Sequence, residues 1–156
     1  MIIERIYIRP SSGAPAIPCE QIEIVSGKGI VGDRYFGRQD APGQNITLIE
    51  AEELEDFFRS QNRSVDYTLS GRNLLTRGIR LNSLVGREFM IDALRLRGVE
   101  LCEPCRGFGK AHAIETHPAD LVIRHFTHRA GLRADILSGG TIRCGSVIEP
   151  VRLADF

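Results

Sequence analysis

The chain has 156 residues, of which 42% are hydrophobic and 26% charged, which is the size and composition of one globular domain with a substantial core. Twenty Lys and Arg residues balance twenty Asp and Glu residues, so the chain lacks the basic field of non-specific nucleic-acid binders. No run approaches the roughly 18 apolar residues of a membrane span, and the charged N-terminus argues against a signal peptide. We therefore expect a cytoplasmic protein with neither a nucleic-acid nor a membrane partner.

Short strands dominate the predicted elements. In chain order the residue pattern predicts strands at 2–8 and 21–25, a strand at 45–48 followed by a helix at 49–61, a strand at 65–69, a hairpin over 86–102 with a phase slip near Asp92, a short helix from Pro118 to Phe126, and a hairpin about Gly139-Gly140. Strands do not alternate regularly with helices, which disfavours a parallel βαβ architecture. The expected fold is a single β-rich domain, built as a partly closed barrel with two short helices.

A glycine-rich segment from Gly27 to Gly37 has four glycines in eleven residues, with apolar residues between them, and predicts an ordered loop. Asp33 and Arg34 lie side by side within it. Adjacent opposite charges are usually solvated or paired. In a glycine-rich segment they can also face a ligand that the backbone approaches closely, and both interpretations stay open.

A second polar segment, Gly71-Arg72-Asn73-Leu74, follows the strand expected at 65–69. An Arg fork beside an Asn amide offers charged and neutral donors, which suits a phosphate or a polar heterocycle. The alternative is structural, and local spacing alone favours it: Asn73 satisfies turn backbone while Arg72 pairs with an acid.

Cysteine usage gives the first chemical lead. In a cytoplasmic chain of this size, few and unevenly spread cysteines indicate ligands, nucleophiles or core thiols rather than a disulfide framework; here they are Cys19, Cys102, Cys105 and Cys144. Cys105 is followed by Arg106 in what reads as a glycine-punctuated loop. Cationic neighbours favour the thiolate, which is both the nucleophile and the metal ligand.

Three interpretations of this cysteine pair compete. Cys105 is a single metal ligand or a sulfur-handling nucleophile at the mouth of a pocket. Alternatively, Cys102 and Cys105 are half of a zinc site that two histidines complete; His112 and His117 are candidates, although they lie closer than in a usual zinc finger. The third interpretation is two thiols in a structural turn, since free cysteines are often merely buried.

Five motifs occur in one order along the chain: Gly29-Ile30-Val31-Gly32-Asp33-Arg34-Tyr35-Phe36-Gly37, Gly71-Arg72-Asn73-Leu74, Leu81 to Gly86, Glu103-Pro104-Cys105, and Gly131-Leu132 to Gly139-Gly140. Together, over about Glu20 to Val147, they resemble the MOSC domain, named for the C-terminal domain of molybdenum cofactor sulfurases. The resemblance implies a β-barrel-like fold and one characteristic cysteine, which falls on Cys105. The Arg-Asn pair of the family falls on Arg72 and Asn73, and Cys102 is an extra thiol.

The resemblance also implies a function. Cys105 would be the metal ligand and catalytic thiol, while Asp33, Arg34, Arg72 and Asn73 would hold the pterin and phosphate of a molybdenum cofactor. The expected activity is reduction of a small N-hydroxylated substrate, with electrons from a separate partner protein.

Two alternatives to this activity stay open. One is a sulfur carrier in which Cys105 accepts persulfide sulfur from a donor protein, and the other is a non-enzymatic module stabilised by zinc. Because the chain has no room for the aminotransferase-like domain of full-length sulfurases, pyridoxal phosphate is not expected.

Overall fold

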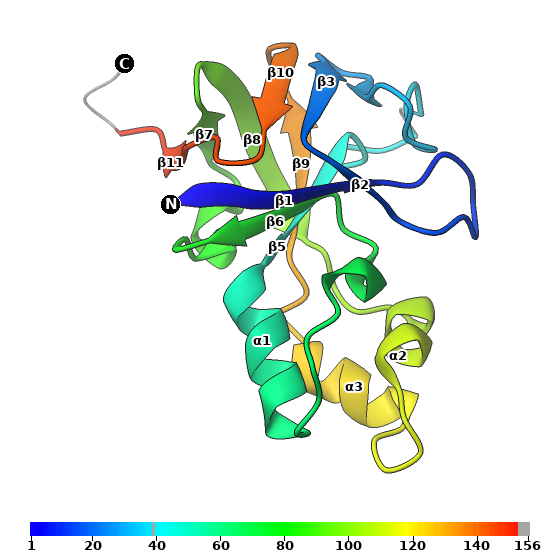
Figure 1. The fold of residues 1–156 in the computed structure, drawn as a ribbon. Coiled ribbons are helices and arrows are strands. Elements are labelled where there is room, and N and C mark those ends of the chain that lie inside the picture. Colours follow the sequence, from blue (N-terminus) through cyan, green and yellow to red (C-terminus); the bar gives the residue numbers. More distant parts are fainter. Residues whose placement is uncertain (39, 153–156) are drawn as a thin grey trace.

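The structure, a computed structural model, describes residues 1–38 and 40–152 (Figure 1). Its larger part is an eight-stranded sheet that curls into a half-barrel. The strand order is β11 (Ile148–Pro150), β7 (Glu88–Ile91), β8 (Leu94–Leu101), β9 (Leu132–Ile136), β5 (Ile46–Glu50), β6 (Leu74–Arg77), β1 (Ile2–Ile8) and β2 (Ile17–Cys19). A smaller sheet has the order β10 (Gly140–Arg143), β3 (Gln21–Val25) and β4 (Gly29–Ile30).

Alternating apolar residues build the core between these strands. In β9, Leu132, Ala134 and Ile136 are buried while the residues between them are partly exposed, as period-2 geometry requires. Ile22 and Ile24 of β3 follow the same rule and belong to the same core as β9, so the small sheet closes one side of the half-barrel. Among the described residues, the core includes none of the predicted site residues Asp33, Arg34, Arg72, Asn73 and Cys105.

Three helices form a second layer beneath the sheet, with a separate aromatic core (Figure 1). They are α1 (Ala51–Ser60), α2 (Arg106–His112) and α3 (Ala119–Phe126). Phe57, Phe58, Phe108 and Phe126 fill the space between them and are at most 4% exposed. This core positions α2, the helix that begins directly after Cys105.

Close packing of α2 on α3 requires a glycine. A Cβ at Gly109 would lie 3.0 Å from the carbonyl oxygen of Ala119 and 2.9 Å from Cγ1 of Ile123. The glycines that make this segment look like a loop in sequence therefore include one that lets two helices touch.

A parallel pair, β5 and β6, lies at the centre of the large sheet, whereas the other neighbouring strands pair antiparallel. Parallel neighbours need a crossover, and α1 together with the 3₁₀-helix η1 (Tyr67–Ser70) provides it. A second 3₁₀-helix, η2 (Leu81–Leu84), follows β6. Among the described strands the parallel pairing is limited to this crossover, so the expectation of a β-rich fold rather than a parallel βαβ architecture is confirmed.

Most strand and helix predictions are confirmed. Strands form at 2–8 and 21–25, and the hairpin over 86–102 turns at Asp92, whose φ is 51°. Helices α1 and α3 cover most of the predicted 49–61 and 118–126.

Three local predictions are wrong. Residues 65–69 form no strand, because the Asp66 carboxylate accepts from the N–H of Thr68 (3.0 Å) and starts η1 instead. The segment after Cys105 is the helix α2 rather than a loop. Gly139-Gly140 does not make a β9–β10 hairpin: β10 pairs with β3, and a Cβ at Gly139 would lie 2.9 Å from the carbonyl oxygen of Ile24.

In the described part of the chain the longest helix, α1, has ten residues, and no helix there is long and apolar enough to cross a bilayer.

Candidate functional site

Cys105 lies where the large sheet meets the helical layer. It follows the end of β8 and is the N-cap residue of α2, with extended backbone (φ −90°, ψ 178°). Its side chain is exposed, and its Sγ accepts a hydrogen bond from the backbone N–H of Phe108 at 3.5 Å. A thiol in this arrangement is open to solvent and also held by the first turn of the helix.

This environment favours the thiolate of Cys105. The Phe108 N–H lowers the pKa of the thiol most; partial burial raises it, and the Gly107 N–H and the charge of Arg72 lower it further, leaving the pKa below its ordinary value. Burial raises the pKa of both Cys19 and Cys144. Of these three thiols, only Cys105 combines exposure with a lowered pKa, which is the condition for nucleophilic attack or metal ligation.

The guanidinium group of Arg72 lies close enough to Cys105 for their charges to interact, and it donates hydrogen bonds to backbone carbonyl groups. Its Nε donates to the carbonyl oxygen of Ala130 (2.9 Å), Nη1 to that of Ser70 (3.2 Å) and Nη2 to that of Cys102 (3.2 Å). Three chain segments thus meet on one guanidinium group. The sequence suggested an acidic side chain as the partner of Arg72, but its partners in the structure are three backbone carbonyl groups.

The glycine-rich loop is folded by Asp33. One carboxylate oxygen accepts from the N–H of Arg9 at 3.0 Å, and the other accepts from the N–H of Tyr35 at 3.2 Å. Arg34 donates its own N–H to the carbonyl of Arg9 (2.9 Å) and places its guanidinium 4.4 Å from the centroid of the Tyr35 ring. Asp33 therefore fastens the loop to the end of β1, and Arg34 packs on the aromatic ring of that loop.

Asn73 connects two strands. Its Oδ1 accepts from both the N–H (3.1 Å) and the hydroxyl (3.0 Å) of Thr47 in β5, and its Nδ2 donates to the carbonyl of Tyr7 in β1 (3.2 Å). The structural alternative, in which Asn73 bonds to backbone groups of a turn, is right that Asn73 bonds to backbone, but that backbone belongs to strands β5 and β1. Its role toward a cofactor stays a prediction.

Electrostatic contacts show which candidates lie together. Burial lowers the pKa of Arg72, while Cys102, Cys105 and Tyr35 raise it and Arg133 lowers it. The glycine-rich loop, through Tyr35, and α2, through Cys105, therefore act on the same guanidinium. The hydrogen bonds of Asp33 are with Arg9 and Tyr35, and those of Asn73 are with β5 and β1, rather than with Cys105.

The zinc interpretation gains no support from the described residues. Within 1–38 and 40–152, no group of three or more His, Cys, Asp or Glu side chains is arranged to hold a metal ion. His112 and His117 pack on Phe57 in the helical core, with ring centroids 6.0 Å and 5.7 Å from it. The two histidines that the zinc interpretation needs as ligands therefore pack in the aromatic core instead.

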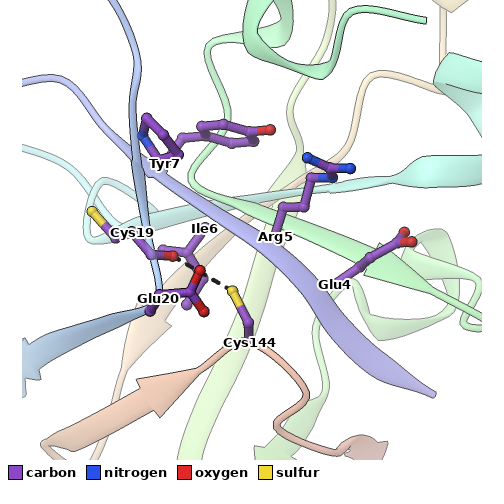
Figure 2. Close-up of a pocket in the computed structure, with 8 residues that line it drawn as sticks. Glu4, Arg5, Ile6, Tyr7, Cys19, Glu20 and Cys144 are labelled. Carbon is purple, nitrogen blue, oxygen red and sulfur yellow. Dashed lines mark hydrogen bonds between the residues drawn. The ribbon is translucent and has the colours of Figure 1, made fainter.

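A cavity of about 290 Å³ lies elsewhere, between β1, the end of β2 and the turn after β10 (Figure 2). Cys19 and Cys144 line it, and the Cys144 thiol donates to the carbonyl oxygen of Cys19 at 3.5 Å. In Figure 2 the Cys144 sulfur faces the Cys19 backbone, whereas the Cys19 sulfur points away from Cys144. None of the predicted site residues lines this cavity, so we place the candidate site at the exposed thiol of Cys105.

Comparison with known families agrees with this geometry. The profile of the MOSC domain matches residues 33–149, three quarters of the chain, including the segments around Asp33, Arg72 and Cys105. The chain belongs to the MOSC domain family. The sequence matches none of the curated proteins.

Solved structures show the same fold. YuaD from Bacillus subtilis superimposes with a TM-score of 0.78 at 19% identity, over 94% of this chain and 93% of that protein. YiiM from Geobacillus stearothermophilus gives 0.71 at 14% identity, over 97% and 75%, and YiiM from Escherichia coli gives 0.67 at 14% identity, over 97% and 70%. At these identities the likeness establishes the MOSC fold and leaves the activity to be argued from the site.

Two contributors to this MOSC site were missed in the sequence. Phe108 supplies the N–H that the Cys105 Sγ accepts, and the charge of Tyr35 raises the pKa of Arg72. A signal for the first existed, because Cys105, Phe108 and His112 are spaced by three and four residues as on one helix face. Gly107 and Gly109 obscured it. No local signal could have shown Tyr35, which lies 37 residues before Arg72.

Proposed function

We propose that this MOSC protein binds a molybdenum cofactor through Cys105 and reduces N-hydroxylated compounds, taking electrons from a separate partner protein. One observation carries the proposal: Cys105 is exposed, and its pKa is lowered by the Phe108 N–H and by Arg72. A lowered pKa makes the thiol easier to deprotonate, and a soft thiolate is a suitable protein ligand for a molybdenum centre.

The residues present fit such a group in chemistry. The Cys105 Sγ would ligate the metal, and the cations of Arg34 and Arg72 would place positive charge near the cofactor phosphate. Asp33 would keep the loop closed over the site by its bonds to Arg9 and Tyr35. When bound, the cofactor supplies the redox chemistry of the reaction.

A sulfur-carrier role is the second candidate, and the same thiolate favours it. The Cys105 thiolate would attack the outer sulfur of a donor persulfide, forming a new sulfur–sulfur bond and releasing the donor thiolate. The reaction conserves electrons and atoms, because one persulfide is exchanged for another. Two equivalents of an external thiol would then reduce the Cys105 persulfide, which releases its outer sulfur as hydrosulfide for a metal centre, returns Cys105 as the thiol and leaves the external thiols as a disulfide.

Metal and sulfur content distinguish the two. The protein is purified without oxygen from a host that makes molybdenum cofactor, and molybdenum, zinc and cyanide-releasable sulfur are measured per chain. Cys105→Ser is compared with Cys144→Ser, which removes a thiol far from the site. We expect molybdenum near one atom per chain in the wild type and in Cys144→Ser, and its loss in Cys105→Ser.

The opposite results decide against the proposal. Molybdenum retained by Cys105→Ser would remove Cys105 as the ligand. Protein without molybdenum but with sulfur that disappears in Cys105→Ser would establish the carrier instead. Protein without either would overturn both functions.

A further inference from the structure

Arg72 forms hydrogen bonds to three separate segments of the chain near Cys105. The carbonyl groups that it binds belong to the end of η1 (Ser70), the end of β8 (Cys102) and the segment before β9 (Ala130). Cys102 begins the short connection that ends at Cys105, and its N–H donates to Gly131 at 2.8 Å. The backbone that leads to the thiol is therefore fixed at its start by both of its polar groups.

The same guanidinium also contacts the helix after the thiol. Its carbon lies 5.0 Å from the centroid of the Phe108 ring, and Phe108 is the residue whose N–H donates to the Cys105 Sγ. On α2 the Phe108 ring also stacks on His112, with centroids 4.3 Å apart. Arg72 thus touches both the connection before Cys105 and the residue that binds its sulfur.

These contacts use the shape of arginine as well as its charge. Three different nitrogen atoms of the side chain donate to three carbonyl oxygens, a pattern that the single ammonium of lysine cannot reproduce from one position. These bonds take one N–H each from Nε, Nη1 and Nη2, so a cofactor phosphate would be left only the second N–H of Nη1 and of Nη2.

We propose that Arg72 is a positioning residue for Cys105: by binding three carbonyl groups and the Phe108 ring, it holds the thiol beneath the Phe108 N–H. The inference rests on the proposed role of Cys105 as the reactive thiol, and it is independent of molybdenum. The reactivity of the Cys105 thiol then depends more on Arg72, 33 positions earlier in the chain, than on the neighbouring Arg106.

The test is the pH profile of Cys105 alkylation in the full chain. Iodoacetamide is reacted between pH 5 and 10, and the rate at Cys105 is followed by peptide mass spectrometry. Arg72→Lys and Arg72→Met are compared with Arg106→Gln, which removes the cation next to Cys105 in sequence. We expect both Arg72 variants to move the midpoint upward by about one pH unit, slowing alkylation about tenfold near pH 6. Arg106→Gln should keep the wild-type midpoint.

Two results would overturn the inference: a wild-type profile in Arg72→Lys, which would leave only the charge as important, or a wild-type profile in Arg72→Met. Near-UV circular dichroism checks that the variants fold. If Arg72→Met does not, Phe108→Leu continues the test, because it keeps the N–H and removes the ring; it should raise the midpoint, and an unchanged midpoint would contradict the role of the ring.

Molybdenum content separates this inference from the proposed function. A shifted midpoint in protein that never binds molybdenum supports the positioning role and refutes the cofactor. An unshifted midpoint in protein that binds molybdenum through Cys105 does the reverse.

Discussion

His112 makes the helical layer sensitive to acid. Its side chain is fully buried beside the rings of Phe57, Phe58, Phe108 and Phe126. The Nδ1 atom lies 2.8 Å from the carbonyl oxygen of Phe108, to which it donates, and Nε2 has no hydrogen-bond partner among the described residues. Burial lowers the pKa of His112 below 6.5, because an added proton would have no acceptor.

The size of the effect follows from the unfolded chain. With a pKa of about 6.5 when exposed, an unfolded histidine gains about 2 kcal/mol from protonation at pH 5, and a folded His112 that stays neutral gains nothing. Protonation therefore favours the unfolded chain, and the free energy of unfolding falls as the pH drops below 6.5; above pH 6.5 this loss is absent. His112→Leu should remove up to about 2 kcal/mol of the loss of stability between pH 7 and pH 5.

Urea unfolding at pH 7 and pH 5 measures this difference. Each protein is compared with itself, so the constant cost of repacking leucine into the site cancels. His128→Asn is the control, because His128 is exposed and its backbone is left-handed (φ 63°), a conformation that asparagine tolerates. An equal loss of stability in His112→Leu and the wild type would refute the reasoning.

Three further predictions concern single contacts, each measured by urea unfolding. Burial raises the pKa of Glu50 to about 6 although the charge of Arg80 lowers it, so the free energy of unfolding falls as the pH rises from 4.5 through 6. Glu50→Gln should therefore raise the free energy of unfolding by about 1 kcal/mol at pH 8 and leave it unchanged at pH 4.5. An equal gain at both pH values would contradict this. Gly98→Ala should cost about 3 kcal/mol, because its Cβ would lie 2.1 Å from the carbonyl oxygen of Leu84; a neutral substitution would show that η2 moves freely. Asn73→Ala should cost about 2 kcal/mol by leaving donors of β5 unpaired, and a cost no larger than that of a surface substitution would count against the strand bridge.

The elements with a local repeat were predictable from sequence. The alternation in β3 and in the β7–β8 hairpin, and the helical spacing in α1 and α3, can be read from consecutive residues. The failures share a different cause. Whether β10 pairs with β9 or β3, and whether Gly109 lies in a loop or at a helix contact, is decided by residues distant in sequence.

The candidate site divides in the same way. Cys105 was predictable from its sequence context, but the cause of its ionisation was not. The sequence pointed to Arg106, whereas the structure has the N–H of Phe108 and the charge of Arg72, which require α2 to form and β8 to lie beside β9. Asn73 was predicted to bind a cofactor or to satisfy turn backbone; the first stays a prediction, and its partners in the structure lie in strands 26 and 66 residues away.

The most direct test of the account is a competition among the four thiols of the wild-type chain. The folded protein is treated at pH 7 with less than one equivalent of isotope-labelled iodoacetamide, and the label on each cysteine is counted by peptide mass spectrometry. Cys105 should carry most of the label, with Cys19 and Cys144 slower because burial raises the pKa of each thiol, and Cys102 protected by burial. Faster labelling of Cys19 or Cys144 than of Cys105 would contradict the claim that the chemistry of this MOSC protein runs through Cys105.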